Sequence, residues 1–163
     1  MDRFENNSEV EITINPRNKI KSHNVRVFVA DDSKPMLEAI IGILTPHFEI
    51  VGTAADGKAA LEMIGRLKPD VAILDISMPF KTGIEIASDL QISAPAVKVV
   101  IISAHDDESY IRAANNAGAL AYVVKTRLGS ELVPAIERVS AGNTFAFPDA
   151  DKVNGNGHSS NRS

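Results

Sequence analysis

Short apolar runs along the chain alternate with stretches in which apolar residues recur at helical spacing. The first run, residues 25–30, is rich in β-branched side chains and stops at Asp31, which predicts a strand. After it, apolar residues three and four positions apart predict one buried face of a helix over residues 36–44. Ser33 can cap this helix, and Pro35 is tolerated in its first turn.

The same strand-then-helix pattern occurs five times. Strands are predicted over residues 25–30, 48–53, 71–74, 97–102 and 121–124, and helices over 36–44, 58–67, 84–91, 107–117 and 130–141. The third and fourth strands are apolar throughout, as expected when helices cover both faces of a sheet. Regular alternation predicts parallel strands with right-handed crossovers. We therefore predict an α/β fold, a flavodoxin-like doubly wound five-stranded parallel sheet in the order 2-1-3-4-5.

The alternating pattern covers residues 25–142, which we predict to be one domain. Residues 1–24 are polar apart from a short alternation at 10–14. That alternation could form a strand, but we predict a flexible N-terminal extension, because chain ends are poorly ordered unless they are tied down. Residues 143–163 are mostly Asp, Asn, Gly and Ser, a composition that predicts a disordered C-terminal tail.

Composition excludes several classes of protein. The chain has 163 residues and no Cys, so disulfides, thiol catalysis and zinc–thiolate sites are excluded. It begins without an apolar secretory signal, and no apolar run approaches the ~20 residues that span a bilayer. The 17 Lys and Arg against 21 Asp and Glu give a net charge of −4, without the basic excess typical of nucleic-acid binding. We expect a cytoplasmic protein with no membrane contact and no direct nucleic-acid binding.

Polar residues stand at the carboxyl ends of four of the five predicted strands. They are Asp31, Asp32, Asp75, Ser103 and Lys125. Because the carboxyl ends of parallel strands meet at one edge of the sheet, we expect these side chains to converge. Three close carboxylates raise one another's pKa values unless positive charge lies among them, and Lys125 supplies only one charge. Mg²⁺, which prefers carboxylate oxygens, is the expected complement.

Asp75 is the best-placed nucleophile, because it ends the buried third strand. A carboxylate beside Mg²⁺ can form an aspartyl-phosphate, and Lys125 and the Ser103 hydroxyl would then hold phosphoryl oxygens. Each residue alone has a commoner role. Asp31 and Asp32 would cap a helix, Lys125 would be a solvated loop residue, and Ser103 would be a turn residue. Their combination at successive strand ends is what indicates a phosphoryl site.

This ordered set resembles the receiver domain of bacterial two-component response regulators. The carrying motifs are Asp31-Asp32, Asp-Ile-Ser-Met-Pro-Phe-Lys-Thr-Gly-Ile-Glu from Asp75, Ser103-Ala104 and Lys125. The phrase Ala-Gly-Ala-Leu-Ala-Tyr-Val-Val-Lys is most like the NarL/FixJ subgroup. The resemblance covers residues 25–142. It implies a phosphorylation-dependent signalling switch that takes its phosphoryl group from a histidine kinase or histidine phosphotransfer protein and acts on a downstream protein target, with a homodimer as a further option.

The resemblance also implies a metal site. Asp75 would be both the phospho-acceptor and a Mg²⁺ ligand, with Asp32 as a direct ligand and Asp31 as a ligand through water. The backbone carbonyl of Ser77 would be a further ligand.

Roles in switching are implied in the same way. Ser103 and Lys125 match the residues that contact the phosphoryl group, and Tyr122 lies at the position of the family's rotating aromatic switch. Residues next to the site would tune the lifetime of the phosphoryl group or a partner contact; these are Ser77, Ala104 and His105.

Two departures and two alternatives accompany this interpretation. Lys125 is followed by Thr126, where many receivers have a cis proline, which puts the position of the lysine in doubt. Only a short segment follows Pro148, without a recognition helix. The chain could therefore be the isolated receiver portion of a DNA-binding transcriptional regulator. An aspartate-nucleophile phosphatase is disfavoured, because Ser77 stands where such enzymes have their acid. We expect no enzyme activity beyond self-phosphorylation and autodephosphorylation.

Overall fold

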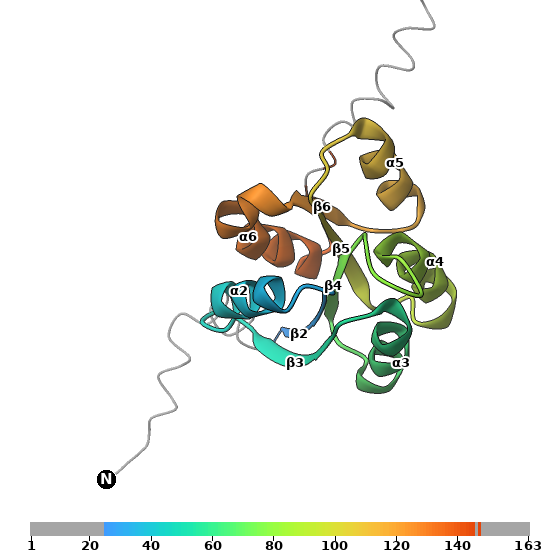
Figure 1. Ribbon diagram of the computed structural model, residues 1–163, viewed down its shortest axis with the longest axis horizontal. Coiled ribbons are helices and arrows are strands. Elements are labelled where there is room, and N and C mark those ends of the chain that lie inside the picture. Colours follow the sequence, from blue (N-terminus) through green and yellow to red (C-terminus); the bar gives the residue numbers. More distant parts are fainter. Residues whose placement is uncertain (1–24, 146, 148–163) are drawn as a thin grey trace, which may run out of the picture.

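In the computed structural model, which describes residues 25–145 and 147, each predicted strand and helix is present (Figure 1). The strands are β2 (Arg26–Ala30), β3 (Glu49–Ala54), β4 (Val71–Asp75), β5 (Lys98–Ser103) and β6 (Ala121–Val124). The helices are α2 (Lys34–Leu44), α3 (Gly57–Leu67), α4 (Gly83–Ser93), α5 (Glu108–Asn116) and α6 (Leu128–Ser140), with the short 3₁₀ helix η2 (Lys125–Arg127) before α6. Among the helices of this described part, none is long and apolar enough to cross a bilayer.

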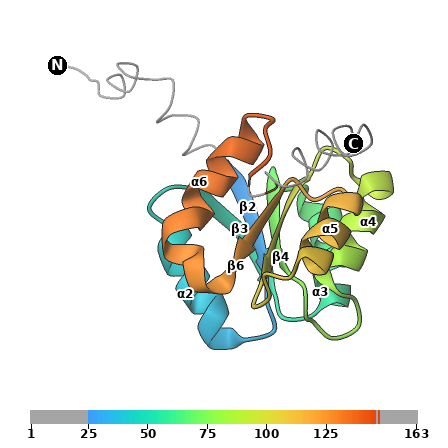
Figure 2. The ribbon, with the colours of Figure 1, turned by 90° about the horizontal axis from the view of Figure 1, so that it is seen from above.

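The five strands form one parallel sheet in the order β3-β2-β4-β5-β6. In chain order this is 2-1-3-4-5, which confirms the predicted fold. Figure 2 shows α2 and α6 on one face of the sheet and α3, α4 and α5 on the other. β4 lies at the centre, and all five of its residues are buried. The apolar run that predicted it is therefore explained by cover on both faces.

Two hydrophobic cores follow from the alternation of side chains along each strand. Phe28 and Leu74 face the core under α3, α4 and α5. Val29 and Ile73, their neighbours in sequence, face the core under α2 and α6. Successive side chains of a strand point to opposite faces, so each central strand contributes to both cores. This packing holds the strand ends, and the polar residues on them, in a fixed arrangement.

The start of α2 forms as the sequence predicts. Ser33 is its N-cap, and the Ser33 hydroxyl accepts a hydrogen bond from the Met36 N–H at 3.2 Å. Pro35 lies in the first turn, where its missing N–H has no partner to lose. The cap places Asp31 and Asp32 directly between β2 and α2.

Sheet contacts extend beyond residue 142, where the sequence placed the end of the domain. Gly142 has a φ of 91°, and the chain then returns along β6. The Phe145 N–H donates to the Leu120 carbonyl at 3.0 Å, and the Tyr122 N–H donates to the Phe145 carbonyl at 3.3 Å. Phe147 is only 3% exposed. Phe147 belongs to the core under α3, α4 and α5, and Phe145 packs against the core under α2 and α6. The predicted extension, residues 1–24, and residues 146 and 148–163 of the predicted tail lie outside the described residues.

Candidate functional site

The structure brings the three predicted carboxylates together. Asp31 and Asp32 follow β2, and Asp75 ends β4, the strand paired with β2. One carboxylate oxygen from each residue lies within 4.8 Å of the others. Asp31 and Asp75 are buried, whereas Asp32 is exposed. The cluster is therefore anchored in the sheet and open to solvent on one side.

Lys125, the residue directly after β6, reaches this cluster. Its Nζ lies 2.8 Å from Oδ2 of Asp31 and 3.2 Å from Oδ1 of Asp75. The described peptide bonds are all trans, including the bond before Thr126, so the lysine occupies the site without the cis proline of many receivers. Burial lowers the pKa of Lys125, but its hydrogen bond to Asp31 and the charge of Asp75 outweigh this and raise it. The lysine is therefore positively charged at neutral pH.

The ionisation of Asp75 is strongly perturbed. Burial, reinforced by the charge of Asp31, raises the pKa of Asp75 from 3.8 to about 6, although Lys125 acts in the opposite direction. Burial disfavours the charged form of a carboxyl group because it removes hydration. Ionised Asp75 is therefore a destabilised anion, the state in which an added cation has the largest effect.

This raised pKa predicts how the stability of the metal-free protein changes with pH. Between about pH 4 and pH 6, the folded state holds a proton on Asp75 that the unfolded chain has released. This group therefore contributes stability that is fully present below about pH 4 and is lost as pH rises through about 6. We expect this contribution to be about 1 kcal/mol larger at pH 5 than at pH 7. Urea unfolding in EDTA at both pH values, with Asp75→Asn as the reference, measures it. An equal pH response of the two proteins would contradict the raised pKa.

The donor set fits a hard divalent cation. Oδ2 of Asp31 is buried and pairs with the Lys125 ammonium at 2.8 Å. Oδ1 of the same carboxylate accepts the Ser33 N–H at 2.9 Å. Three carboxylates against one ammonium leave an excess of negative charge and of oxygen atoms, the ligands that Mg²⁺ prefers. An ion would enter from the solvent side of the cluster, where Asp32 is exposed.

Ser103 and Tyr122 are joined through the backbone of His105. The Ser103 hydroxyl oxygen accepts the His105 N–H at 3.0 Å, and the Tyr122 hydroxyl donates to the His105 carbonyl at 2.7 Å. Ser103 and Tyr122 are both buried. Burial, the main cause, raises the pKa of the Tyr122 phenol, which keeps it protonated as a donor. Sequence reasoning missed this link, because a backbone bridge does not depend on residue type.

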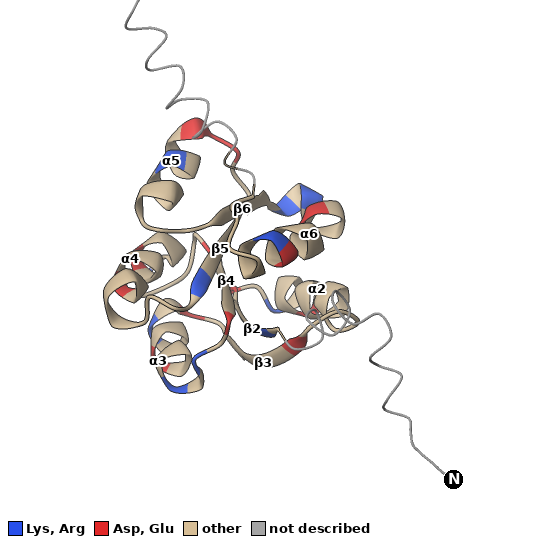
Figure 3. Ribbon diagram, turned by 180° about the vertical axis from the view of Figure 1, so that it is seen from behind, with Lys and Arg blue, Asp and Glu red and all other residues tan. Residues whose placement is uncertain are grey.

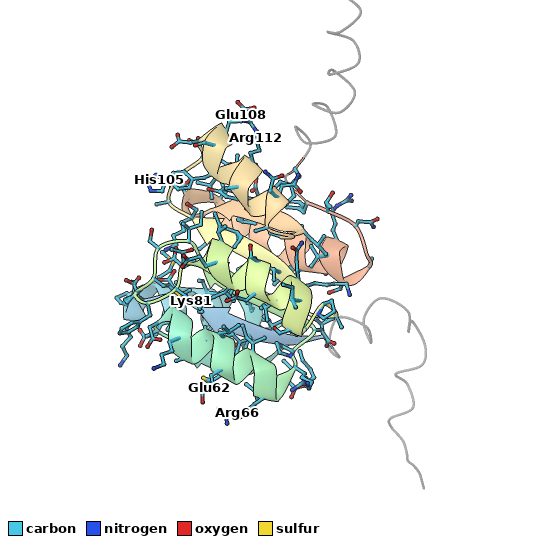
Figure 4. All side chains as sticks on the ribbon, turned by 90° about the vertical axis from the view of Figure 1, so that its right-hand side faces the viewer. Glu62, Arg66, Lys81, His105, Glu108 and Arg112 are labelled. Atoms are coloured by element: carbon cyan, nitrogen blue, oxygen red, sulfur yellow. The ribbon has the colours of Figure 1, made fainter. Side chains whose placement is uncertain are left out.

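The imidazole of His105 lies outside this link. Figure 4 shows His105 extending outward from the loop between β5 and α5. Its ring stacks on Tyr110 with centroids 4.8 Å apart. The neighbouring Ala104 is exposed, as is Ser77 in the loop after β4. The three residues that the sequence assigned to tuning therefore lie on the solvent side of the site.

Two glycines that sequence reasoning did not select hold the loop after β4. The Gly83 N–H donates to the Ile76 carbonyl at 3.2 Å, and a Cβ on Gly83 would overlap the carbonyl of Asp75. The Gly57 N–H donates to the Pro79 carbonyl at 3.0 Å, and a Cβ there would overlap the backbone of Lys81. Any side chain at either position would displace the loop next to Asp75.

Charge outside the site is spread over the molecule. In Figure 3, Lys and Arg positions occur on α3, α5 and α6 together with acidic positions. Several of these side chains pair locally, as Arg112 does with Glu108 and Arg127 with Glu131. The concentration of carboxylates at the strand ends is therefore a specific feature of the site.

Comparison with known proteins places this geometry in a family. The model of the response regulator receiver domain matches residues 27–137. The transcriptional regulatory protein DegU of Brevibacillus brevis is 33% identical over 132 residues, which cover 80% of this chain and 56% of DegU. The chain spans about half the length of the curated relatives it matches.

Solved structures of related proteins have a similar fold. The signal receiver domain of NarL from Mycobacterium tuberculosis is 34% identical, with a TM-score of 0.71, and the match covers 74% of this chain and 99% of that chain. A complex of CheX with CheY, BeF₃ and Mg²⁺ from Borrelia burgdorferi contains a chain that is 28% identical, with a TM-score of 0.62, matched over 66% of this chain and 87% of that one.

These findings confirm the resemblance drawn from the sequence, including its likeness to NarL-type receivers. Receiver domains are in general signalling switches rather than enzymes, and their signalling depends on phosphorylation. The phosphatase alternative is not supported. The family match and the fold agree on one assignment: this chain belongs to the response regulator receiver family.

Proposed function

We propose that Asp75 is the phospho-acceptor of this receiver. The observation that carries the proposal is the position of Asp75: it is buried at the end of the central strand, 3.2 Å from the Lys125 ammonium and within 4.8 Å of the carboxylates of Asp31 and Asp32. A nucleophile in this position has one cation to contact phosphoryl oxygens and two further carboxylates to hold a metal ion.

The metal in this proposal is Mg²⁺. Asp31, Asp32, Asp75 and the backbone carbonyl of Ser77 would hold it, and it would neutralise charge on the phosphoryl group during transfer. Asp31 shares its oxygens with the Ser33 N–H and Lys125, which favours the proposal that it acts through water. Exposed Asp32 is free to be a direct ligand.

The proposed reaction is the transfer of a phosphoryl group from a phosphohistidine or an acyl phosphate to the carboxylate of Asp75. An Asp75 oxygen forms a bond to phosphorus, while the bond from phosphorus to the donor breaks and its electron pair leaves with the donor. The donor in the cell is the phosphohistidine of a kinase or phosphotransfer protein, and acetyl phosphate can replace it. Hydrolysis by water later restores the carboxylate and releases inorganic phosphate.

The switch in this proposal runs through His105. A phosphoryl oxygen on Asp75 would accept a hydrogen bond from the Ser103 hydroxyl, whose oxygen already holds the His105 N–H. Movement of that loop would change the carbonyl that Tyr122 contacts. The surface of α5, β6 and α6 would then take a second conformation that a downstream protein or a second copy of the chain recognises.

Mg²⁺ should stabilise the protein, because it binds a site that only the folded chain assembles. At a concentration ten times its Kd, we expect a gain of about 1.4 kcal/mol, seen as a rise in Tm of several degrees. Asp32→Asn should lose most of this rise. Asp106→Asn, the same change at an exposed position, should keep it. Equal rises in the two variants would contradict the metal site.

The proposed function is tested by incubation with acetyl phosphate and Mg²⁺, followed by intact-mass measurement. The chain should gain the mass of one phosphoryl group, and EDTA should prevent the gain. An unchanged mass in the presence of Mg²⁺ would contradict the proposal.

A second candidate concerns the output. The matched curated relatives are transcriptional regulatory proteins, and the chain covers 56% of DegU. This favours a receiver that controls a DNA-binding domain. Determining whether the reading frame continues beyond Ser163 into a helix-turn-helix domain tests this candidate, and a stop codon there favours output through protein contact.

A further inference from the structure

The loop between β4 and α4 contains a strained turn beside the site. Phe80 has a φ of 72°, a conformation that L-residues rarely adopt. The Lys81 N–H donates to the Pro79 carbonyl at 2.9 Å, which closes a three-residue γ-turn with Phe80 at its centre. Glycine would take this conformation without steric conflict. The turn itself therefore does not require phenylalanine.

Contacts on both sides hold this turn in place. The Pro79 carbonyl also accepts the Gly57 N–H at 3.0 Å, from the first residue of α3. The Lys81 ammonium pairs with Asp89 of α4 at 2.8 Å. In Figure 4, Lys81 lies at the start of α4, on the side of the molecule from which His105 also extends. The residues on both sides of Phe80 are therefore tied to α3 and α4.

Packing does not explain the phenylalanine either. Phe80 is 79% exposed, so its ring contributes little to the core. Other exposed apolar residues follow strands at the same edge of the sheet: Ala55 follows β3, Pro79 follows β4, and Ala104 follows β5. Exposed aromatic residues beside a functional site are typical anchors of protein contacts.

We propose that Phe80 is a docking contact for the protein that delivers the phosphoryl group to Asp75. This inference rests on the proposed function and adds a residue that selects the donor. A small donor such as acetyl phosphate needs only the charged centre. A protein that carries phosphohistidine must bring its surface against this edge of the sheet, where an apolar patch beside its histidine would cover the Phe80 ring.

The test compares a small donor with protein donors. Phosphorylation of the wild type and of Phe80→Gly is first measured with acetyl phosphate and Mg²⁺. The autophosphorylated kinase cores encoded in the same genome are then assayed at limiting concentration, and transfer is followed for each core that labels the wild type. Ile92→Ser is the matched control, because Ile92 is also an exposed apolar residue, at 87%, but lies on α4.

Phe80→Gly should keep its acetyl phosphate rate within about twofold and lose about tenfold in transfer from the kinase core, the effect of removing one aromatic anchor. Phe80→Tyr should restore transfer, and Ile92→Ser should match the wild type. Glycine relieves the turn, so the Tm of Phe80→Gly should not fall.

Several outcomes would overturn the inference. Unchanged transfer to Phe80→Gly would show that the ring is not a donor contact. Equal losses with both donors would show that Phe80 shapes the site instead. If the wild type forms a dimer that Phe80→Gly loses while transfer stays intact, the ring serves self-association instead. If no kinase core labels the wild type, the inference loses its donor protein and fails. Failure of acetyl phosphate to label the wild type would contradict the proposed function itself.

Discussion

Asp75→Asn should abolish phosphorylation of this chain by acetyl phosphate. The amide nitrogen and oxygen keep the shape of the side chain, but the amide is not a nucleophile and forms no acyl phosphate bond. We expect intact-mass measurement in Mg²⁺ to show full loss of the added phosphoryl group. The variant should remain folded, because it removes a carboxylate that burial already destabilises, as the raised pKa of Asp75, about 6, indicates.

The matched control for this experiment is Asp106→Asn. Asp106 is exposed in the loop after β5, close to the site in the chain but outside its carboxylate cluster. This variant should be phosphorylated at the wild-type rate. Labelling of Asp75→Asn equal to the wild type would assign the phosphoryl group to another residue. Asp32→Asn serves as a third arm, because it should be labelled slowly while keeping the acceptor.

Lys125→Met should have the largest effect on stability. The lysine is paired with two carboxylates, one of which has no exposed side-chain surface. Its removal leaves Asp31 and Asp75 buried without a compensating charge. Breaking buried ion pairs from one side costs about 3–5 kcal/mol, and partial exposure of the lysine reduces our expectation to about 2–3 kcal/mol. Mg²⁺ should restore part of the loss.

Urea unfolding in EDTA at neutral pH measures this effect. Far-UV circular dichroism is the appropriate signal, because the chain contains no Trp. Arg127→Met is the control: it lies two residues further on, in an exposed pair with Glu131, and surface pairs contribute at most about 1 kcal/mol. A loss for Lys125→Met no greater than that of the control would show that the ion pair does not compensate the buried carboxylates.

Much of the fold was predictable because its signals are local. β4 is an unbroken apolar run, and apolar residues recur at helical spacing in α2, so element type follows from periodicity alone. The order of the strands followed from regular alternation and crossover handedness. The backbone pairing of Phe145 beside β6 was not predictable, because its partners Leu120 and Tyr122 lie more than twenty positions away.

The site was predictable to the same degree. Asp31, Asp75 and Lys125 stand at strand ends, and the topology of a parallel sheet brings such ends together. The conformation of the loops was not predictable, because it depends on backbone contacts between separate loops. The γ-turn at Phe80 and the bridge through His105 are examples.

The sequence by itself therefore determined the order of the strands and the identity of the residues at their ends, because periodicity and residue type are local properties of the chain. Only the tertiary structure decided how charge and exposure divide among these residues. It buried Asp31 and Asp75 against Lys125, left Asp32 in solvent and turned Phe80 outward. Burial and ionisation depend on neighbours that are distant in sequence, so they are settled only when the strands are packed together.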